Sequence, residues 1–99
     1  MSATDAVIIG AGHNGLVAAN LLADAGWSVV VLEAAEQAGG AVQSGELTSP
    51  GFVNDLCSAF YPFAAISPIM RGLHLEDHGL RWRHGGATAD RDLPGAALA

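Results

Sequence analysis

One stretch of the chain, residues 6–33, reads AVIIGAGHNGLVAANLLADAGWSVVVLE and constrains the fold more than any other part. It opens with a β-branched apolar run, Ala6–Ile9, of the kind that fills a strand buried on both faces. Three glycines follow, then apolar residues at helical spacing, and then a second strand-like run, Ser28–Leu32, that ends at Glu33. Strand, glycine turn, helix, strand and acid is the order that a dinucleotide-binding βαβ unit requires.

The three glycines of this stretch, Gly10, Gly12 and Gly15, each have a predicted role. Gly10 allows the chain to turn sharply off the strand without a Cβ clash. Gly12 leaves room for a pyrophosphate to approach the backbone, and Gly15 lets the helix pack closely against the strands. Gly26 stands at the position of a helix C′ residue. No Ser, Thr or Asp is placed to cap the helix, so a ligand phosphate could partner its first N–H groups.

Glu33 lies eighteen residues after Gly15 and would accept hydrogen bonds from an adenosine ribose. Its negative charge would repel a 2′-phosphate, which argues against NADP as the ligand. The predicted fold class is α/β: a Rossmann-like βαβ unit with a parallel sheet and a right-handed helical crossover. The chain reads as an incomplete domain of this kind.

Composition and charge exclude several classes of protein. With 99 residues the chain makes one small domain at most, and 51% hydrophobic residues indicate a folded chain. A net charge of −6 argues against nucleic-acid binding. There is no Lys, and the four cations are Arg71, Arg81, Arg83 and Arg91. A phosphate near Gly12 would therefore be held by backbone N–H groups and the helix dipole.

The histidines and the single cysteine predict neither a metal site nor a catalytic one. His74 and His78 could share one helix face, but the sequence offers no third ligand. Cys57 can form no disulfide within the chain and is predicted to be a buried structural thiol. Since the N-terminus also lacks a basic leader, we expect a reducing compartment, the cytoplasm.

A glycine pair, Gly39-Gly40, follows Glu33 and marks a tight turn or a close approach of the backbone. Together with the G-x-G-x-x-G loop, these residues make the chain resemble the N-terminus of FAD-dependent oxidoreductases of the phytoene dehydrogenase and amine oxidase type. The runs Ser49–Phe52 (SPGF) and Phe60–Phe63 (FYPF) are similar to the phytoene-dehydrogenase-like branch. The similarity spans Asp5–His84.

The resemblance implies FAD as the cofactor, with the glycine loop at the pyrophosphate, the acid at the adenosine ribose and the glycine pair along the flavin side. The cofactor-binding residues would then be Gly10, Ala11, Gly12, Asn14, Gly15, Glu33, Ala34, Gly39, Gly40 and Ala41. Ala41 departs from the family pattern, because many members carry Arg directly after the glycine pair. Catalytic residues are not assigned by the resemblance.

The resemblance also implies an activity, in which the flavin accepts a hydride from a small lipophilic or amine-type substrate. Family members are several times longer than this chain, and full-length relatives could associate peripherally with a membrane. A stand-alone NAD-binding Rossmann protein is an alternative, for which Glu33 is equally suitable and which the glycine pair disfavours. An inactive truncated fragment is the other alternative. The substrate, the electron acceptor and the oligomeric state stay open.

Beyond the glycine pair, the predicted elements are shorter and weaker. Phe52–Asp55 predicts a short strand. The aromatic side chains of Phe60–Phe63 are predicted to be core; by resemblance, this region would instead approach the flavin ring and an apolar substrate cavity. Ser67-Pro68 predicts the start of a helix that runs toward Leu75.

The end of the chain predicts little regular structure. The helix begun at Ser67 would extend at most to His78, with Gly79 ending it, and Leu80–His84 predicts a strand. We expect residues 1–84 to be the N-terminal part of the FAD-binding domain. Residues 85–99 would be a loop and the start of a hairpin in a truncated chain.

Overall fold

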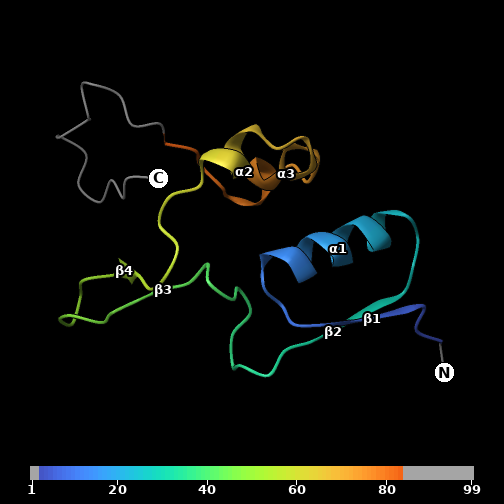
Figure 1. Ribbon diagram of the computed structural model, residues 1–99, viewed down its shortest axis with the longest axis horizontal. Helices are drawn as coiled ribbons and strands as arrows, with labels where there is room; N and C mark the ends of the chain where they lie inside the picture. Colours follow the sequence, from blue (N-terminus) through green and yellow to red (C-terminus); the bar gives the residue numbers. More distant parts are fainter. Residues whose placement is uncertain (1–2, 84–99) are drawn as a thin grey trace. The chain divides into compact units, whose positions relative to one another are not determined.

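The computed structural model describes residues 3–83, and the chain divides into two compact units, Met1–Ser58 and Ala59–Ala99. The first unit holds strands β1 to β4 and helix α1, and the second holds two short helices and a 3₁₀ turn (Figure 1). The predicted loop and hairpin at residues 85–99 lie outside the described residues.

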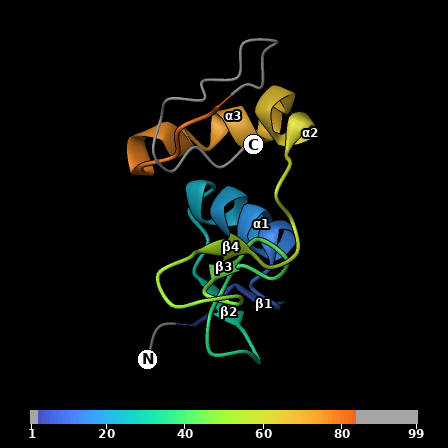
Figure 2. The ribbon, with the colours of Figure 1, turned by 90° about the vertical axis from the view of Figure 1, so that its left-hand side faces the viewer.

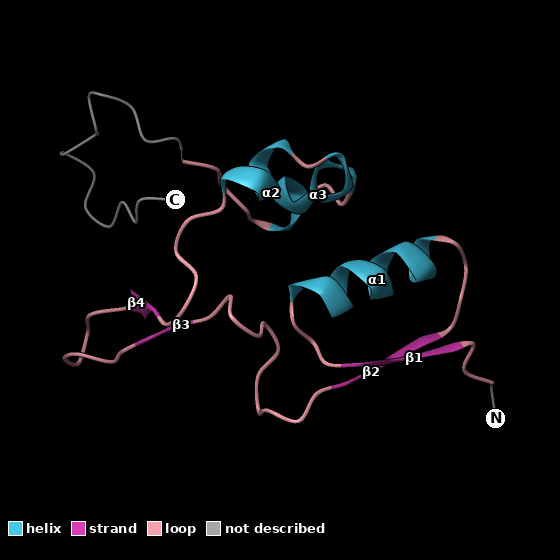
Figure 3. Cartoon of the chain, viewed as in Figure 1, coloured by secondary structure: helices cyan, strands magenta, loops and turns pink. Residues whose placement is uncertain are grey.

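The first unit opens with the predicted βαβ arrangement. Strand β1 spans Ala6–Ile9, helix α1 spans His13–Asp24 and strand β2 spans Val29–Leu32 (Figure 3). The two strands pair in parallel, with Ala6 opposite Val29 and Ile9 opposite Leu32. The α/β Rossmann-like fold class is therefore confirmed.

Helix α1 packs on one face of the β1–β2 pair, as the two perpendicular views show (Figure 1, Figure 2). Ile8 lies on the covered face, because a Cβ built at Gly15 of the helix would be 3.3 Å from its Cγ2 atom. Side chains alternate along both strands between half-buried and exposed positions. The exposed ones are Val7, Ile9, Val30 and Leu32.

The prediction that the first strand is buried on both faces is therefore wrong for the described part of the chain. Ile9 is 88% exposed and Leu32 is 53% exposed, although both belong to β-branched or aliphatic runs typical of a parallel sheet. The sequence of a strand shows which of its faces are apolar. A face becomes buried only where another helix or sheet packs against it. Among residues 3–83, the one residue classed as fully buried is Ala11, which is 4% exposed.

The C-terminus of α1 ends as predicted at a glycine. Gly26 has φ +88°, and its N–H donates to the carbonyl of Ala23 at 2.9 Å. The N–H of Trp27 donates to the carbonyl of Leu22 at 3.0 Å. These two bonds form a Schellman motif, which satisfies carbonyl groups that the helix leaves without partners.

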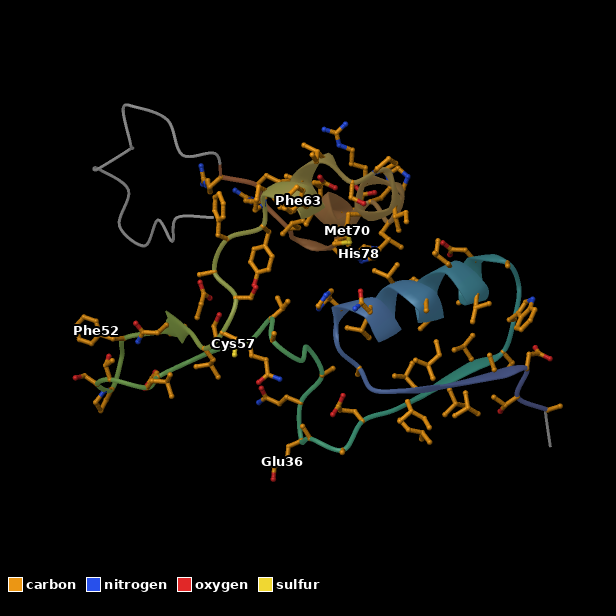
Figure 4. The ribbon with its side chains drawn as sticks, in the orientation of Figure 1. Glu36, Phe52, Cys57, Phe63, Met70 and His78 are labelled. Atoms are coloured by element: carbon orange, nitrogen blue, oxygen red, sulfur yellow. The ribbon has the colours of Figure 1, made fainter. Side chains whose placement is uncertain are left out.

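A small antiparallel hairpin follows in the same unit. Strand β3 spans Ser44–Gly45 and β4 spans Asn54–Asp55, and the hydroxyl of Ser44 donates to Oδ1 of Asp55 at 2.7 Å. The predicted strand Phe52–Asp55 is thus confirmed only for its second half. The side chain of Phe52 is exposed beside the short strand (Figure 4).

The second unit contains helix α2, Pro62–Ile66, and helix α3, Pro68–Gly72, followed by the 3₁₀ turn η1, Leu75–His78. The predicted cap is confirmed, because the hydroxyl oxygen of Ser67 accepts the N–H of Met70 at 3.4 Å. Helix α2 was not predicted, although its Pro62 occupies the first helical turn, where the missing N–H costs nothing.

The single helix predicted from Ser67 toward Leu75 is wrong, because it is broken at His74. This residue adopts φ +50°, a left-handed conformation that cannot continue a right-handed helix. Gly79, at φ +100°, ends the 3₁₀ turn, so the predicted stop is in the right place. Among residues 3–83, no helix is long and apolar enough to cross a membrane.

Three further predictions for the region after residue 56 are wrong. Residues 80–83 form no strand; instead the indole N–H of Trp82 donates to Glu76 Oε1 at 3.0 Å. His84 lies outside the described residues. Of the aromatic side chains expected in a core, Phe60 is 71% exposed and Phe63 is 81% exposed, whereas Tyr61 is half-buried. Figure 4 labels Phe63. Cys57 is exposed rather than buried.

Candidate functional site

The loop between β1 and α1 carries the glycine motif and is fixed to the end of β2. Gly10 has φ +98°, a conformation that L-residues rarely adopt, so the predicted sharp turn is confirmed. Its N–H donates to the carbonyl of Leu32 at 2.7 Å. The loop therefore begins beside the carboxyl end of both strands, which is where parallel α/β sheets bind ligands.

Gly15 is required by the packing of the helix on the strands. A Cβ at this position would clash with the carbonyl oxygen of Gly10 and lie 3.3 Å from the side chain of Ile8. The clash is with backbone, which cannot move aside as the end of a flexible side chain would. The predicted role of Gly15 in close helix–strand packing is confirmed.

Gly12 is different, because neither its conformation nor its packing requires a glycine. It is the N-cap of α1, with φ −76° and ψ 176°, an extended conformation open to any residue. The nearest atom that a Cβ would meet is the Cα of Gly40, at 4.0 Å, which is an ordinary contact distance. The space next to the Cα of Gly12 could hold a side chain, and because glycine has none, a ligand can occupy it.

The N-terminus of α1 can receive an anion. No side chain caps it, and its first turn contains no acidic residue. Helix N–H groups without partners and the positive end of the helix dipole favour a negatively charged group. Since Gly12 adds no side chain at this end, a phosphate could approach the backbone directly.

Glu33 follows β2 and is exposed, but its carboxylate is held by backbone groups. Oε2 accepts the N–H of Ala11 at 2.6 Å, and Oε1 accepts the N–H of Ala35 at 2.9 Å. The N–H groups of Ala35 and Ala11 lower the pKa of this carboxyl below its ordinary value, against a small opposing effect of desolvation. Glu33 is therefore a carboxylate at neutral pH; Ala11 and Ala35 make its two close backbone hydrogen bonds, and the N–H of Ala34 adds a weaker favourable contact.

The glycine pair packs against the glycine loop. The N–H of Gly39 donates to the carbonyl of Ala11 at 2.8 Å, and Gly39 forms a parallel bridge with Gly12. A Cβ at Gly40 would be 3.0 Å from the Cα of Gly12, and Gly40 has φ +59°. The predicted close approach is confirmed, and the partner is the loop itself.

The structure thus brings together seven of the ten residues assigned to the cofactor: Gly10, Ala11, Gly12, Gly15, Glu33, Gly39 and Gly40. Gly15 and Asn14 lie in the first turn of α1, and Asn14 is exposed. Ala34 is exposed directly after Glu33, and the carbonyl of Ala41 accepts the N–H of Ser58 at 3.2 Å. Sequence reasoning assigned Ala11 to the cofactor but did not predict that its N–H donates to Glu33 and its carbonyl accepts from Gly39.

The lowered pKa of Glu33 predicts a dependence of stability on pH. A carboxyl whose pKa is lower in the folded state contributes stability above its unfolded value, here 4.5, and loses it as the pH falls through the folded value. We expect the difference in urea midpoint between the wild type and Glu33→Gln to be largest near pH 7 and to shrink below pH 4.5. Glu36→Gln controls for the change in net charge. A difference that grows on acidification would contradict the assignment.

Comparison with known proteins agrees with this geometry. Residues 8–93 match a family model described as an NAD(P)-binding Rossmann-like domain. Over 78 residues the chain is 44% identical to pyridine nucleotide-disulfide oxidoreductase domain-containing protein 2 of Mus musculus, covering 78% of this chain and 13% of that protein. Over 75 residues it is 39% identical to one of the subunits of the limonene dehydrogenase of Castellaniella defragrans, covering 76% of this chain and 13% of that protein.

A third relative matches a shorter part of the chain. Over 50 residues the chain is 48% identical to an L-amino-acid oxidase of Vipera ammodytes ammodytes, covering 50% of this chain and 10% of that protein. No solved structure gives a significant match. The chain spans about 13% of the length of the two relatives that it matches over most of its own residues.

Proposed function

The chain belongs to the family of NAD(P)-binding Rossmann-like domains, and we propose that the dinucleotide it binds is FAD. The observation that carries the proposal is Gly12. It caps a helix that has no side-chain cap, it needs no glycine for its own conformation, and its Cβ position is open. A pyrophosphate placed there would meet free helix N–H groups and the positive end of the dipole.

The remaining residues around the loop fit the rest of an adenosine dinucleotide. A carboxylate has roughly four acceptor positions, so Glu33 can still accept from a ribose hydroxyl beside the hydrogen bonds from Ala11 and Ala35 and the weaker contact with the N–H of Ala34. The pair Gly39-Gly40 packs against Ala11 and Gly12 of the glycine loop. The family resemblance implies that this pair lies along the flavin side of the cofactor. NAD is the second candidate, and Glu33 suits it equally; the glycine pair favours FAD.

Bound FAD would supply the redox chemistry by accepting a hydride from the substrate. Because the flavin would accept the hydride, the reaction needs no side-chain nucleophile, and this chain would contribute the groups that hold the pyrophosphate and the ribose. We propose a small lipophilic or amine-type substrate for a full-length protein that carries this domain, in keeping with the limonene dehydrogenase and L-amino-acid oxidase names of two relatives. We further propose a cytoplasmic location, because a single cysteine suits a reducing compartment.

The test of this proposal is the order of affinity for three dinucleotides. We expect FAD to bind more tightly than NAD, and NAD more tightly than NADP, because the Glu33 carboxylate repels a 2′-phosphate. Isothermal titration of the chain, or of a longer protein that contains it, with each ligand at one ionic strength measures the order. Glu33→Gln should narrow the gap between NAD and NADP. Tighter binding of NADP than of FAD by the wild type would overturn the proposal.

A further inference from the structure

We propose that Glu33 holds the glycine loop in its ligand-binding shape through the peptide unit of Ala11, separately from any contact with a ribose. Glu33 is then a positioning residue as well as a ligand-binding one. The inference deepens the proposed dinucleotide site and rests on it for its binding experiment.

The first observation is the hydrogen bond from Ala11. Its nitrogen lies 2.6 Å from Glu33 Oε2, and hydrogen bonds to an ionised acceptor are shorter and stronger than those between neutral groups. The partners are 22 residues apart in the chain, so the bond joins the glycine loop to the segment after β2. Oε1 accepts the N–H of Ala35 at 2.9 Å, which fixes the orientation of the carboxylate.

The second observation is that the Ala11 peptide is held on its other side too. Its carbonyl accepts the N–H of Gly39 at 2.8 Å. Ala11 is 4% exposed, so a missing partner for either group would cost more here than at the surface. Glu33 and Gly39 both belong to the segment after β2, and together they fix the peptide that precedes Gly12.

A consequence follows for the ligand. While Glu33 is charged, the Ala11 N–H is used within the protein and is not offered to a phosphate. The loop must then present N–H groups from Gly12 onward, at the start of α1. A variant that cannot accept at both oxygens would loosen this arrangement. Glu33→Gln is such a variant, because its amide NH₂ donates and cannot accept.

Binding of an adenosine ligand without ribose hydroxyls separates positioning from ribose contact. If Glu33 acts through the ribose alone, Glu33→Gln weakens binding of ADP and leaves binding of 2′,3′-dideoxy-ADP unchanged. Positioning predicts that the variant weakens both ligands, the dideoxy ligand by about tenfold. Glu36→Gln removes the same charge from an exposed carboxylate on the same loop (Figure 4) and should leave both affinities at the wild-type level. Unchanged dideoxy-ADP binding in Glu33→Gln would overturn the inference.

A measurement without any ligand decides the case independently. NMR of the free wild-type chain should show a scalar coupling across the hydrogen bond from Ala11 N to Glu33 Cδ, and a downfield Ala11 amide proton. The proton should move upfield in Glu33→Gln and stay in place in Glu36→Gln. The absence of that coupling in the wild type would overturn the positioning role even if Glu33→Gln failed to fold. If instead the wild type bound neither ADP nor FAD, the proposed function would fail while the coupling still reported on the bond.

Discussion

Replacing Gly12 with valine is expected to reduce FAD affinity by at least about 100-fold, which corresponds to roughly 2.8 kcal/mol, while the chain stays folded. Valine is compatible with the extended backbone at this position, φ −76° and ψ 176°. Apart from its neighbours in the chain, the Cβ itself would meet no atom closer than the Cα of Gly40, at 4.0 Å. Its methyl groups would occupy the space that we assign to the pyrophosphate. Titration with FAD and far-UV circular dichroism measure the two halves of this prediction.

Two controls make the Gly12 result specific. Gly12→Ala adds the Cβ alone and should give a smaller loss of affinity, with a cost to the helix cap of about 1 kcal/mol at most. Gly72→Ala makes the same chemical change at the end of α3, where a Cβ meets no atom within 4 Å. Gly72→Ala should bind FAD as the wild type does. If Gly12→Val bound FAD as tightly as the wild type, the pyrophosphate could not lie next to Gly12.

Replacing Gly15 with alanine is expected to destabilise the fold itself, whereas Gly12→Val lowers affinity and leaves the chain folded. Its Cβ would clash with the backbone carbonyl of Gly10 and press on Ile8, so helix α1 must move away from the strands. Overpacking of this kind costs about 1–3 kcal/mol or more. The higher helix propensity of alanine offsets only about 1 kcal/mol of this cost. A chain with one fully buried residue among those described has little stability to lose.

Urea unfolding followed by circular dichroism measures this loss. Gly15→Ala should show a lower midpoint than the wild type, or no folded baseline at all. Gly72→Ala serves again as the control, because it makes the same change in open space. A Gly15→Ala variant as stable as the wild type would show that the helix does not pack on the strands as described.

Residues 6–33 could be predicted from the sequence because their signals are local. The apolar runs, the three glycines and Gly26 each act within a few residues, and the structure has the strand–helix–strand order and the Schellman end that they indicate. For Gly39, the sequence could predict a close approach of the backbone to another group, but not that this group is Ala11. Two loops 28 residues apart meet there, and no local pattern states which backbone a glycine pair will touch.

The wrong predictions after residue 56 share one cause: burial and backbone conformation there depend on which groups surround a residue in the folded chain. Phe60 and Phe63 are apolar, but burial depends on what packs over them, and a residue's hydrophobicity does not supply that layer. The break at His74 depends on a left-handed conformation that a non-glycine residue adopts only when its surroundings favour it. Neither is visible in the pattern of side chains.

Residue-resolved NMR during an FAD titration tests whether a dinucleotide binds at the start of α1. We expect the largest amide shifts at Gly12, Asn14 and Gly15, with smaller shifts at Ala34 and Gly39-Gly40. The same titration of Gly12→Val should leave the spectrum unchanged. Shifts of equal size in Gly12→Val, or wild-type shifts absent from residues 10–15 at saturating FAD, would contradict the claim.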